Sequence, residues 1–298
     1  MTNDERPLAI DGFGGGGGTH IGLLRAGYRV ISVDNWKPAI QTQLANGLRV
    51  VNQDLQKKRI PKRYRGKVRL MWLSPPCPPF SQATDGIGRD DPRDCIPAAL
   101  ASVKRILPQI VMMENVKGLA SPKHAGYMTE VVAELESFGY TVEYRVLNAA
   151  DYGLPQARKR MYLVAVLEGT PKFPIPPIGQ EITTMGDFLG WTPRNVRLRA
   201  INGGDTSWVF QRPAMTVVGS FKPEVMSAPG YRTAGGYSRQ DMPGSVLLLP
   251  EEAAALQGFP PGFKFVGRAN ERWLIIGNAV MSEMAYLLAR ANDMEIVR

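Results

Sequence analysis

Five consecutive glycines, Gly14–Gly18, constrain the fold of this chain more than any other feature. A glycine run on its own is typical of a flexible linker. Here the run follows a short apolar segment that ends at Asp11, and it is followed by Thr19. Thr19 can cap a helix that continues to Gly27, a residue type that suits a helix end. A strand, a glycine turn and a helix in this order predict a loop whose backbone approaches a nucleotide-like ligand closely.

Strand-like and helix-like segments alternate beyond this loop. The expected strands cover residues 29–33, 50–51, 68–73, 110–113, 140–147 and 160–167, and the expected helices cover 38–46, 96–107 and 127–138. This alternation predicts an α/β fold with a doubly wound, mostly parallel sheet.

The character of the chain changes at Glu168, where prolines crowd together and periodicity fades until about Gly244. We expect residues 1–167 and 272–298 to form the ligand-binding domain, and residues 168–271 to form a second, smaller, irregular and strand-rich domain with its return hinge. Helical segments are expected at 250–259 and in the last apolar stretch, to Ala291. Basic and aromatic residues alternate in the second domain, which suits nucleic-acid contact or a merely solvated surface.

Composition limits the classes of protein. The 298 residues carry a net charge of +9, which permits an anionic partner, and two cysteines, which form neither a disulfide framework nor a metal cluster. The polar start leads to no signal-peptide segment, and no apolar run approaches membrane-spanning length. We therefore expect a globular protein that works in a reducing compartment of the cell.

Four prolines surround Cys77 directly after the apolar run Val68–Leu73. Proline fixes φ and ends a strand, so Cys77 is expected on a stiff loop at a strand end, where sites of α/β sheets are built. A positioned nucleophile and a buried structural cysteine are both compatible with this stretch. The polar segment Gln82–Asp94 predicts a long mobile loop of the kind that forms lids.

Three acids stand near the ends of expected strands. Asp34 ends the second strand, about twenty residues beyond the glycines, and suits hydrogen bonds to ribose hydroxyls. Asp54 follows the third strand and can accept from an adenine amine or simply cap a loop. Glu114 follows a fully apolar strand, where a carboxylate is costly without a partner or a task.

Six segments in order resemble the motifs of the DNA cytosine-5 methyltransferases, across nearly the whole chain. They are Asp11-x-Phe13-x-Gly15-x-Gly17-Gly18, Pro76-Cys77-x-x-Phe80-Ser81, Glu114-Asn115-Val116, Gln156-x-Arg158-x-Arg160, Leu256-Gln257-Gly258-Phe259-Pro260 and Gly277-Asn278-Ala279-Val280. The sequence departs from the family at Gly12 and Gly14, which loosens the loop, and at Pro78, where the family most often has Gln.

The resemblance implies a Rossmann-like class I methyltransferase that uses S-adenosyl-L-methionine and no metal. The implied partner is double-stranded DNA, and the protein is expected to bind it as a monomer. The implied location is the cytoplasm of a bacterium or of a phage-infected host, and the implied role is DNA modification in a restriction-modification system. The implied catalytic residues are Cys77, Glu114, Asn115, Arg158 and Arg160. The implied cofactor residues are Phe13, Gly15, Gly17, Gly18, Asp34, Asn35, Asp54, Leu55, Pro76, Asn278 and Val280. The implied DNA contacts are Ser81, Gln82, Arg89, Arg212 and Arg232.

The chemistry follows from those residue types. Cytosine C5 is too weak a nucleophile until a thiolate adds at C6, so Cys77 is expected to add there. Glu114 is expected to hydrogen-bond to N3 and donate a proton to it, and Arg158 and Arg160 are expected to bind O2. Stacking covers the face of the ring, so the base must leave the duplex. Three alternatives remain: an RNA methyltransferase of the same fold, a DNA-binding protein without catalysis, and a nicotinamide-dependent oxidoreductase. The recognition sequence, the source and the exact group transferred stay open.

Overall fold

The computed structural model describes residues 5–76, 91–179, 181–201, 203–219, 225–226 and 244–293. Contacts divide the chain into two units. Unit 1 comprises residues 1–147, 159–175 and 279–298, and unit 2 comprises residues 148–158 and 176–278. The segments 148–158 and 272–278, which the sequence placed in the larger domain, are therefore grouped with unit 2.

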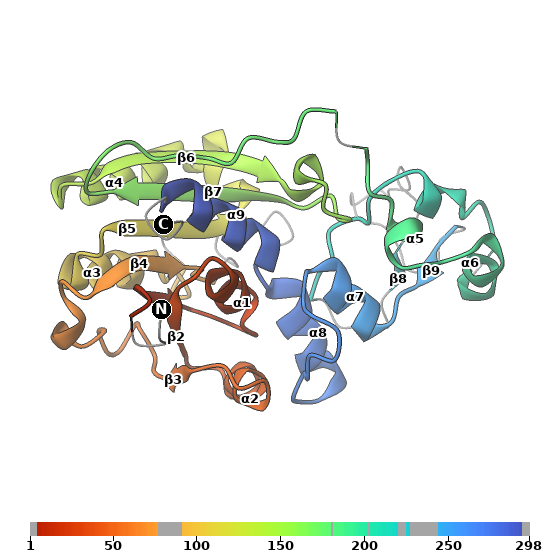
Figure 1. Cartoon of the computed structure of the whole chain (residues 1–298), viewed down its shortest axis with the longest axis horizontal. Helices are drawn as coiled ribbons and strands as arrows, with labels where there is room; N and C mark the ends of the chain where they lie inside the picture. Colours follow the sequence, from red (N-terminus) through yellow and green to blue (C-terminus); the bar gives the residue numbers. More distant parts are fainter. Residues whose placement is uncertain are drawn as a thin grey trace. The chain divides into compact units, whose positions relative to one another are not determined.

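A seven-stranded sheet forms the centre of unit 1 (Figure 1). Its strands are β1 (Leu8–Gly12), β2 (Arg29–Asp34), β3 (Val50–Asn52), β4 (Val68–Leu73), β5 (Ile110–Val116), β6 (Thr141–Asn148) and β7 (Lys159–Val166). The order is β3-β2-β1-β4-β5-β7-β6, in which the first five strands run parallel and β7 runs antiparallel to β5. This is the mostly parallel sheet that the alternation predicted and the Rossmann-like fold that the family resemblance implied, and both predictions are confirmed.

Helices cover both faces of this sheet. They are α1 (Gly18–Arg25), α2 (Lys37–Ala45), α3 (Ile96–Ile106), α4 (Ala125–Ser137) and α9 (Ser282–Asn292), with 3₁₀ turns η1 (Lys62–Tyr64), η4 (Lys117–Ala120) and η5 (Pro122–His124). Figure 1 shows α1 and α9 in front of the sheet and α3 and α4 behind it. Val103 of α3 and Leu135 of α4 are fully buried in the same apolar cluster as Met71 of β4. Burial of such side chains stabilises the unit by about 1.5–3 kcal/mol each.

Helix α1 begins two residues earlier than the sequence predicted. Its N-cap is Gly17, with φ 94°, and Thr19 lies inside the helix, so the prediction of a Thr19 cap is wrong. Only glycine adopts this left-handed conformation at little cost, which is why the turn into the helix falls on Gly17. The predicted end holds, since Gly27 has φ 101° just beyond the C-cap.

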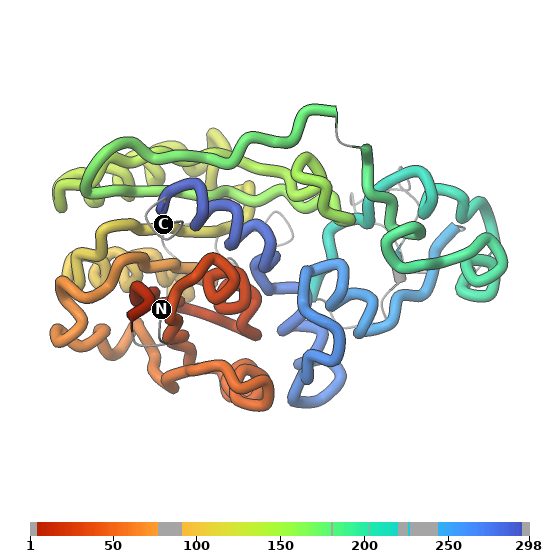
Figure 2. The backbone as a smooth tube through the Cα atoms, viewed as in Figure 1, coloured from red at the N-terminus to blue at the C-terminus, as the bar shows by residue number. Residues whose placement is uncertain are grey.

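The end of α9 is fixed to the start of the sheet. Asp293 is 1% exposed and accepts a hydrogen bond from the Tyr28 hydroxyl at 2.6 Å. It also accepts from the Arg69 guanidinium at 3.0 Å through each of its carboxylate oxygens. Figure 2 shows the last helix returning to the unit that contains the first strand. These charge-assisted bonds join segments that are far apart in the sequence into one folded body.

Unit 2 is irregular, as expected, but its described part is helical and not strand-rich. Its elements are η6 (Ala149–Tyr152), α5 (Met185–Phe188), α6 (Pro193–Arg199), η7 (Ser207–Phe210), β8 (Val225–Met226), β9 (Val246–Leu247), α7 (Pro250–Leu256) and α8 (Ala269–Asn278). The described strands of unit 2 have two residues each, so the strand-rich prediction is wrong for this part of the chain. Residues 275–278 belong to α8 and do not lead directly into the last helix.

The stretch Ala269–Asn292 has the length that a membrane-crossing segment would need, and its most apolar window of 18 residues has a mean hydropathy of 1.2. The expectation that no apolar stretch approaches that length was therefore wrong by this measure. The stretch consists of α8 and α9, and 61% of its most apolar window is buried inside the protein. Burial of this kind is typical of the core helices of globular folds.

Candidate active site

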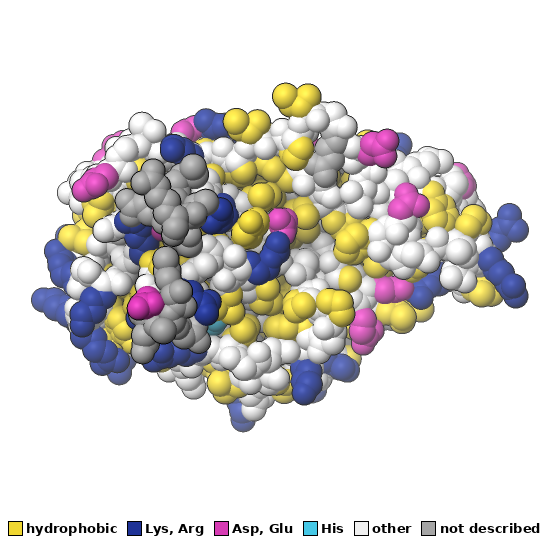
Figure 3. Space-filling model, viewed as in Figure 1, with side chains coloured by type: hydrophobic (Ala, Val, Ile, Leu, Met, Phe, Trp, Pro, Cys, Tyr) yellow, Lys and Arg dark blue, Asp and Glu magenta, His cyan; other side chains and the backbone are white. Residues whose placement is uncertain are grey.

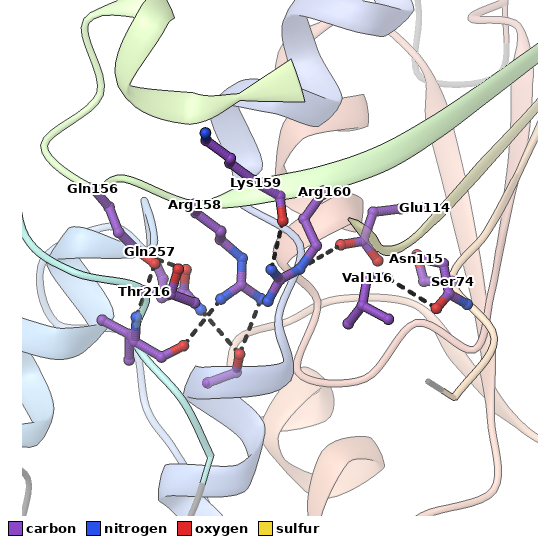
Figure 4. A network of polar contacts seen from close by, with 12 residues as sticks. Ser74, Glu114, Asn115, Val116, Gln156, Arg158, Lys159, Arg160, Thr216 and Gln257 are labelled. Carbon is purple, nitrogen blue, oxygen red and sulfur yellow. Dashed lines mark hydrogen bonds and ion pairs between the residues drawn. The ribbon is translucent and has the colours of Figure 1, made fainter. Parts of the chain in front are cut away.

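Strands β5 and β7 bring a carboxylate and a guanidinium together (Figure 4). Glu114 lies within β5, not beyond its end as the sequence predicted, and Arg160 lies in β7 opposite Val116. Arg160 Nε is 3.2 Å from Glu114 Oε1, and the two side chains are 15% and 11% exposed. A buried carboxylate is costly unless it has a charged partner, so Arg160 explains how Glu114 is tolerated at the edge of an apolar strand.

Asn115, the next residue of β5, is 1% exposed and holds the neighbouring strand where that strand ends. Its Nδ2 donates to the Pro75 carbonyl oxygen at 3.2 Å, and its Oδ1 accepts from the Val116 backbone amide at 2.9 Å. Pro75 is two residues before Cys77, which itself lies outside the described residues. Asn115 therefore fixes the direction in which the chain leaves β4 toward Cys77.

The glycine loop is braced by side chains from β2 and α2. Asp34 Oδ2 accepts from the Gly15 amide at 2.8 Å, and its Oδ1 accepts from the Trp36 amide at 2.8 Å. Gln43 Nε2 donates to the Gly15 carbonyl oxygen at 2.8 Å. Burial raises the pKa of Asp34, and the backbone hydrogen bonds oppose that rise. Asp34 thus holds the glycine loop through Oδ2 and the start of α2 through Oδ1, a role that sequence reasoning missed.

A buried polar chain lies beneath the same loop. Ser32 Oγ donates to Asp11 Oδ2 at 3.0 Å, and His20 Nδ1 lies 2.8 Å from Ser32 Oγ. Burial raises the pKa of Asp11 to about 7 and lowers the pKa of His20 to about 4, so His20 is neutral at neutral pH. His20 therefore has a buried hydrogen-bond partner in Ser32, which sequence reasoning missed. Ser32 is the one uncharged polar residue in its strand, so the sequence could have indicated a buried hydrogen bond at this position.

The loop itself is tightly enclosed at some glycines and open at another. A Cβ on Gly14 would lie 2.8 Å from Asp11 Oδ2, and a Cβ on Gly18 would lie 2.2 Å from the Val280 carbonyl oxygen. Gly14 therefore makes room for the buried polar chain and does not loosen the loop. A Cβ on Gly15 would meet nothing within 4 Å, so the backbone of Gly15 faces open space in which a ligand can approach it.

The sequence model of one family, described as C-5 cytosine-specific DNA methylase, matches residues 9–200. That is most of unit 1 and the start of unit 2. This chain belongs to that family. The resemblance that the six motifs indicated is confirmed.

Methylases of known name resemble the chain over nearly its whole length. The Type II methyltransferase M.NgoMIV of Neisseria gonorrhoeae is 31% identical over 93% of this chain and 94% of its own. The Type II methyltransferase M.NaeI of Lentzea aerocolonigenes is 30% identical over 93% of this chain and 72% of its own. Both alignments therefore span most of the two units and not the motifs alone.

Solved structures share the fold. A DNA modification methyltransferase, described as putative, from an Escherichia coli prophage superposes with a TM-score of 0.70 at 20% identity, covering 96% of this chain and 98% of its own. A mutant form of Spodoptera frugiperda DNMT2 superposes with a TM-score of 0.71 at 15% identity, covering 98% of this chain and 99% of its own. At these identities the likeness establishes the fold alone.

The other cofactor candidates of the methylase occupy several environments. Phe13, with φ 59°, packs partly buried against the apolar cluster, and Leu55 is 2% exposed within it. Asp54 caps its own turn, since its Oδ1 accepts from the Gln56 amide at 2.9 Å and its Oδ2 lies 3.6 Å from Lys57 Nζ. Asp54 therefore acts as a loop cap, one of the two roles expected for it.

The remaining cofactor candidates are divided between the two units. Asn35 is exposed just after β2, Pro76 is exposed beyond β4, and Val280 is buried in unit 1. Asn278 ends α8 in unit 2. Within unit 1, then, these candidates lie near the glycine loop or at strand ends.

Arg158 belongs to unit 2 and is only 3% exposed. Its Nη1 donates to the Val217 carbonyl oxygen and its Nη2 to the Gly277 carbonyl oxygen, both at 3.0 Å. Gln156 donates to the Leu256 carbonyl oxygen at 3.0 Å and accepts from the Val217 amide at 3.0 Å (Figure 4). These bonds favour a positioning role for Arg158 within unit 2 over direct contact with a base.

The DNA-contact candidates are only partly described. Arg212 is exposed in unit 2, whereas Ser81, Gln82, Arg89 and Arg232 lie outside the described residues, as does most of the expected lid. Within the described part of the chain, no group of three or more His, Cys, Asp or Glu side chains could hold a metal ion.

Proposed function

We propose that this methylase transfers a methyl group from S-adenosyl-L-methionine to C5 of a flipped-out cytosine in double-stranded DNA, through a covalent bond between Cys77 and C6. The observation that carries the proposal is the arrangement at the ends of β4, β5 and β7. Glu114 and Arg160 are paired at 3.2 Å, and Asn115 holds Pro75 at 3.2 Å, two residues from the proposed nucleophile.

The glycine loop fits the cofactor. Gly15 opens to free space while Gly14 and Gly18 are enclosed, so the loop combines a fixed shape with one accessible stretch of backbone. The cofactor would supply an electrophilic methyl group on a sulfonium. We assign Phe13 to its adenine, Asp34 and Asn35 to its ribose, and Val280 to the closure of the pocket. Gly17, Gly18, Asp54, Leu55, Pro76 and Asn278 complete the proposed set.

The residues of the chain carry the base chemistry. The Cys77 thiolate adds to C6, and the electron pair released from the C5–C6 double bond moves toward N3 and O2. Protonated Glu114 donates its proton at N3, and Arg160 holds the carboxylate and can donate to O2. C5 then has enamine character and bonds to the methyl group. As this bond forms, the bond between the methyl group and the sulfonium would break, and its electron pair would stay on the sulfur. Loss of the C5 proton to a base, return of the N3 proton to Glu114 and elimination of the Cys77 thiolate then restore the aromatic ring.

DNA must be held and opened for this attack. Unstacking one cytosine costs a few kcal/mol, which phosphate contacts have to offset. We assign Ser81, Gln82, Arg89, Arg212 and Arg232 to those contacts, and unit 2 to target recognition. The named relatives are Type II methyltransferases, and we extend that role, in a monomeric cytoplasmic enzyme, to this chain.

The test is to trap the covalent step. DNA in which every cytosine is replaced by 5-fluorocytosine contains any target sequence, and its C5 fluorine cannot leave as a proton does. With S-adenosyl-L-methionine we expect a denaturation-resistant complex whose DNA is attached to the peptide containing Cys77. Attachment to the Cys95 peptide, or methylation of ordinary DNA without any trapped complex, would overturn the mechanism. Transfer to RNA and not to DNA would support the alternative substrate.

A further inference from the structure

Unit 1 carries a dense group of positive charges that the proposed reaction does not use. Residues 55–76 contain eight Lys and Arg and residues 95–110 contain two, and neither segment contains an Asp or Glu. The exposed members in and just after η1, together with Lys104 near the end of α3, define what we call the amino-edge patch: Lys62, Arg63, Arg65, Lys67 and Lys104.

Hydrogen bonds join the two segments into one surface. Arg65 Nη1 donates to the carbonyl oxygens of Lys104 at 3.3 Å and Arg105 at 3.1 Å. Arg105 Nε donates to the Ile60 carbonyl oxygen at 2.9 Å. Because η1 precedes β4 and α3 precedes β5, this surface lies at the amino ends of the parallel strands. Figure 3 shows Lys and Arg side chains gathered at the lower left, where Figure 1 places the chain between β3 and β4.

Little negative charge compensates this surface. Asp54 pairs with Lys57 at 3.6 Å, and Asp293 pairs with Arg69 at 3.0 Å. Among the described residues, no ion pair within 4 Å involves Lys62, Lys67 or Lys104. Uncompensated like charges repel and reduce the stability of the folded state, so a surface of this kind is favourable mainly when a polyanion covers it.

The patch faces away from the proposed active site. Glu114 and Asn115 lie at the carboxyl end of β5, whereas the patch lies at the amino ends. A strand of six residues spans about 20 Å, and duplex DNA resists bending over lengths of up to about 150 base pairs. A short duplex held at the carboxyl edge therefore cannot also reach the patch.

We propose that the amino-edge patch is a second, sequence-independent binding surface for duplex DNA. It binds the phosphate backbone of a distant part of the same DNA or of a second duplex. Lysine and arginine on exposed, flexible stems match the dense and regular charge of DNA, and the established substrate class of the family supplies the polyanion. The inference concerns binding alone and does not depend on the proposed Cys77 chemistry.

The test compares two variants that lose the same charge. Lys62→Gln/Lys67→Gln removes two patch cations whose side chains take part in no hydrogen bond or ion pair that the structure shows. Arg145→Gln/Lys172→Gln removes two exposed cations elsewhere in unit 1, of which Arg145 forms an exposed ion pair with Glu143 at 2.7 Å. Such an exposed pair contributes at most about 1 kcal/mol to stability. Affinity for a duplex of random sequence is measured by fluorescence anisotropy without cofactor, between about 50 and 200 mM salt.

For the patch variant we expect the slope of log affinity against log salt to become less steep, by about 0.9 for each lost phosphate contact. The control variant is expected to keep the wild-type slope, and both are expected to keep the wild-type urea unfolding midpoint. Equal slopes in the two variants would overturn the proposal. Binding of the patch to vesicles containing phosphatidylserine but not to the duplex would also overturn it, in favour of a membrane surface.

Discussion

Replacement of Gly18 by alanine tests how the glycine loop is enclosed. The new Cβ would lie 2.2 Å from the Val280 carbonyl oxygen and 3.4 Å from the Ala279 Cβ. A carbon and a carbonyl oxygen normally approach no closer than about 3.3 Å, so the two segments must separate by about 1 Å. The colliding atom belongs to the backbone, and no side-chain rotation can relieve the contact.

The magnitude follows from two opposing effects. Overpacking that shifts the backbone costs about 1–3 kcal/mol. Alanine in place of glycine in a helix gains up to about 1 kcal/mol, and less at the first helical position, which Gly18 occupies. We therefore expect Gly18→Ala to lower the free energy of unfolding by about 1–2 kcal/mol. If Val280 closes the cofactor pocket, affinity for S-adenosyl-L-methionine should fall about tenfold for each 1.4 kcal/mol of binding free energy that the displacement of Val280 removes.

Gly126→Ala is the matched control. Gly126 lies in the first turn of α4, and a Cβ there would meet nothing within 4 Å. This variant should be neutral or more stable by up to about 1 kcal/mol, because alanine reduces the freedom of the unfolded chain. The measurements are the urea unfolding midpoint by circular dichroism and the cofactor dissociation constant by calorimetry.

Two results would refute the reasoning. One is a Gly18→Ala protein as stable as Gly126→Ala. The other is rescue of Gly18→Ala by a second change, Val280→Ala. That change keeps the backbone oxygen, so it should restore nothing if the contact is the one described.

Three further predictions follow. Cys77→Ala should abolish methyl transfer, measured as tritium transfer to DNA, and leave cofactor affinity near normal. Cys95→Ala should keep activity, because burial raises the pKa of the Cys95 thiol to about 11 and keeps it unreactive. Equal losses of tritium transfer in the two variants would show that the nucleophile is misassigned. Burial raises the pKa of Asp11 from 3.8 to about 7, so the folded protein retains a proton there that the unfolded chain has lost, and this contribution to stability disappears as pH rises through about 7. Asp11→Asn should therefore gain stability relative to the wild type in urea unfolding between about pH 5 and pH 8, and an unchanged difference across that range would contradict the buried-carboxyl argument. Arg158→Lys should lower the free energy of unfolding by about 1–3 kcal/mol, because one ammonium cannot reach two carbonyl oxygens as the guanidinium does, and a neutral result would show that the two bonds do not matter.

Local patterns in the sequence were sufficient for the succession of strands and helices. The apolar run Val68–Leu73 became β4 with the same bounds, and Pro38 and Gly47 marked the two ends of α2 to within a residue. These features work because proline and glycine restrict or free their own backbone, whatever the rest of the chain does. The Thr19 cap failed because a competing local choice, Gly17 in the left-handed region, was available two residues earlier.

The motifs named the family, but the distances within the site came from tertiary structure. Glu114 and Arg160 are forty-six positions apart, and only the antiparallel placement of β7 beside β5 brings their side chains within 3.2 Å. The same holds for His20, Ser32 and Asp11, whose hydrogen bonds depend on β1 and β2 lying side by side.

In unit 1 the sequence by itself therefore determined which segments are strands, which are helices, and which chemical groups stand near the strand ends. In unit 2 it did not, since the described part is helical where strands were predicted. Only the tertiary structure decided which of those groups touch. It assigned Asp34 to the Gly15 amide and Arg158 to two carbonyl oxygens of unit 2. The physical reason is that backbone propensity acts over a few residues, whereas the partner of a buried polar group is chosen by the packing of elements distant in the chain.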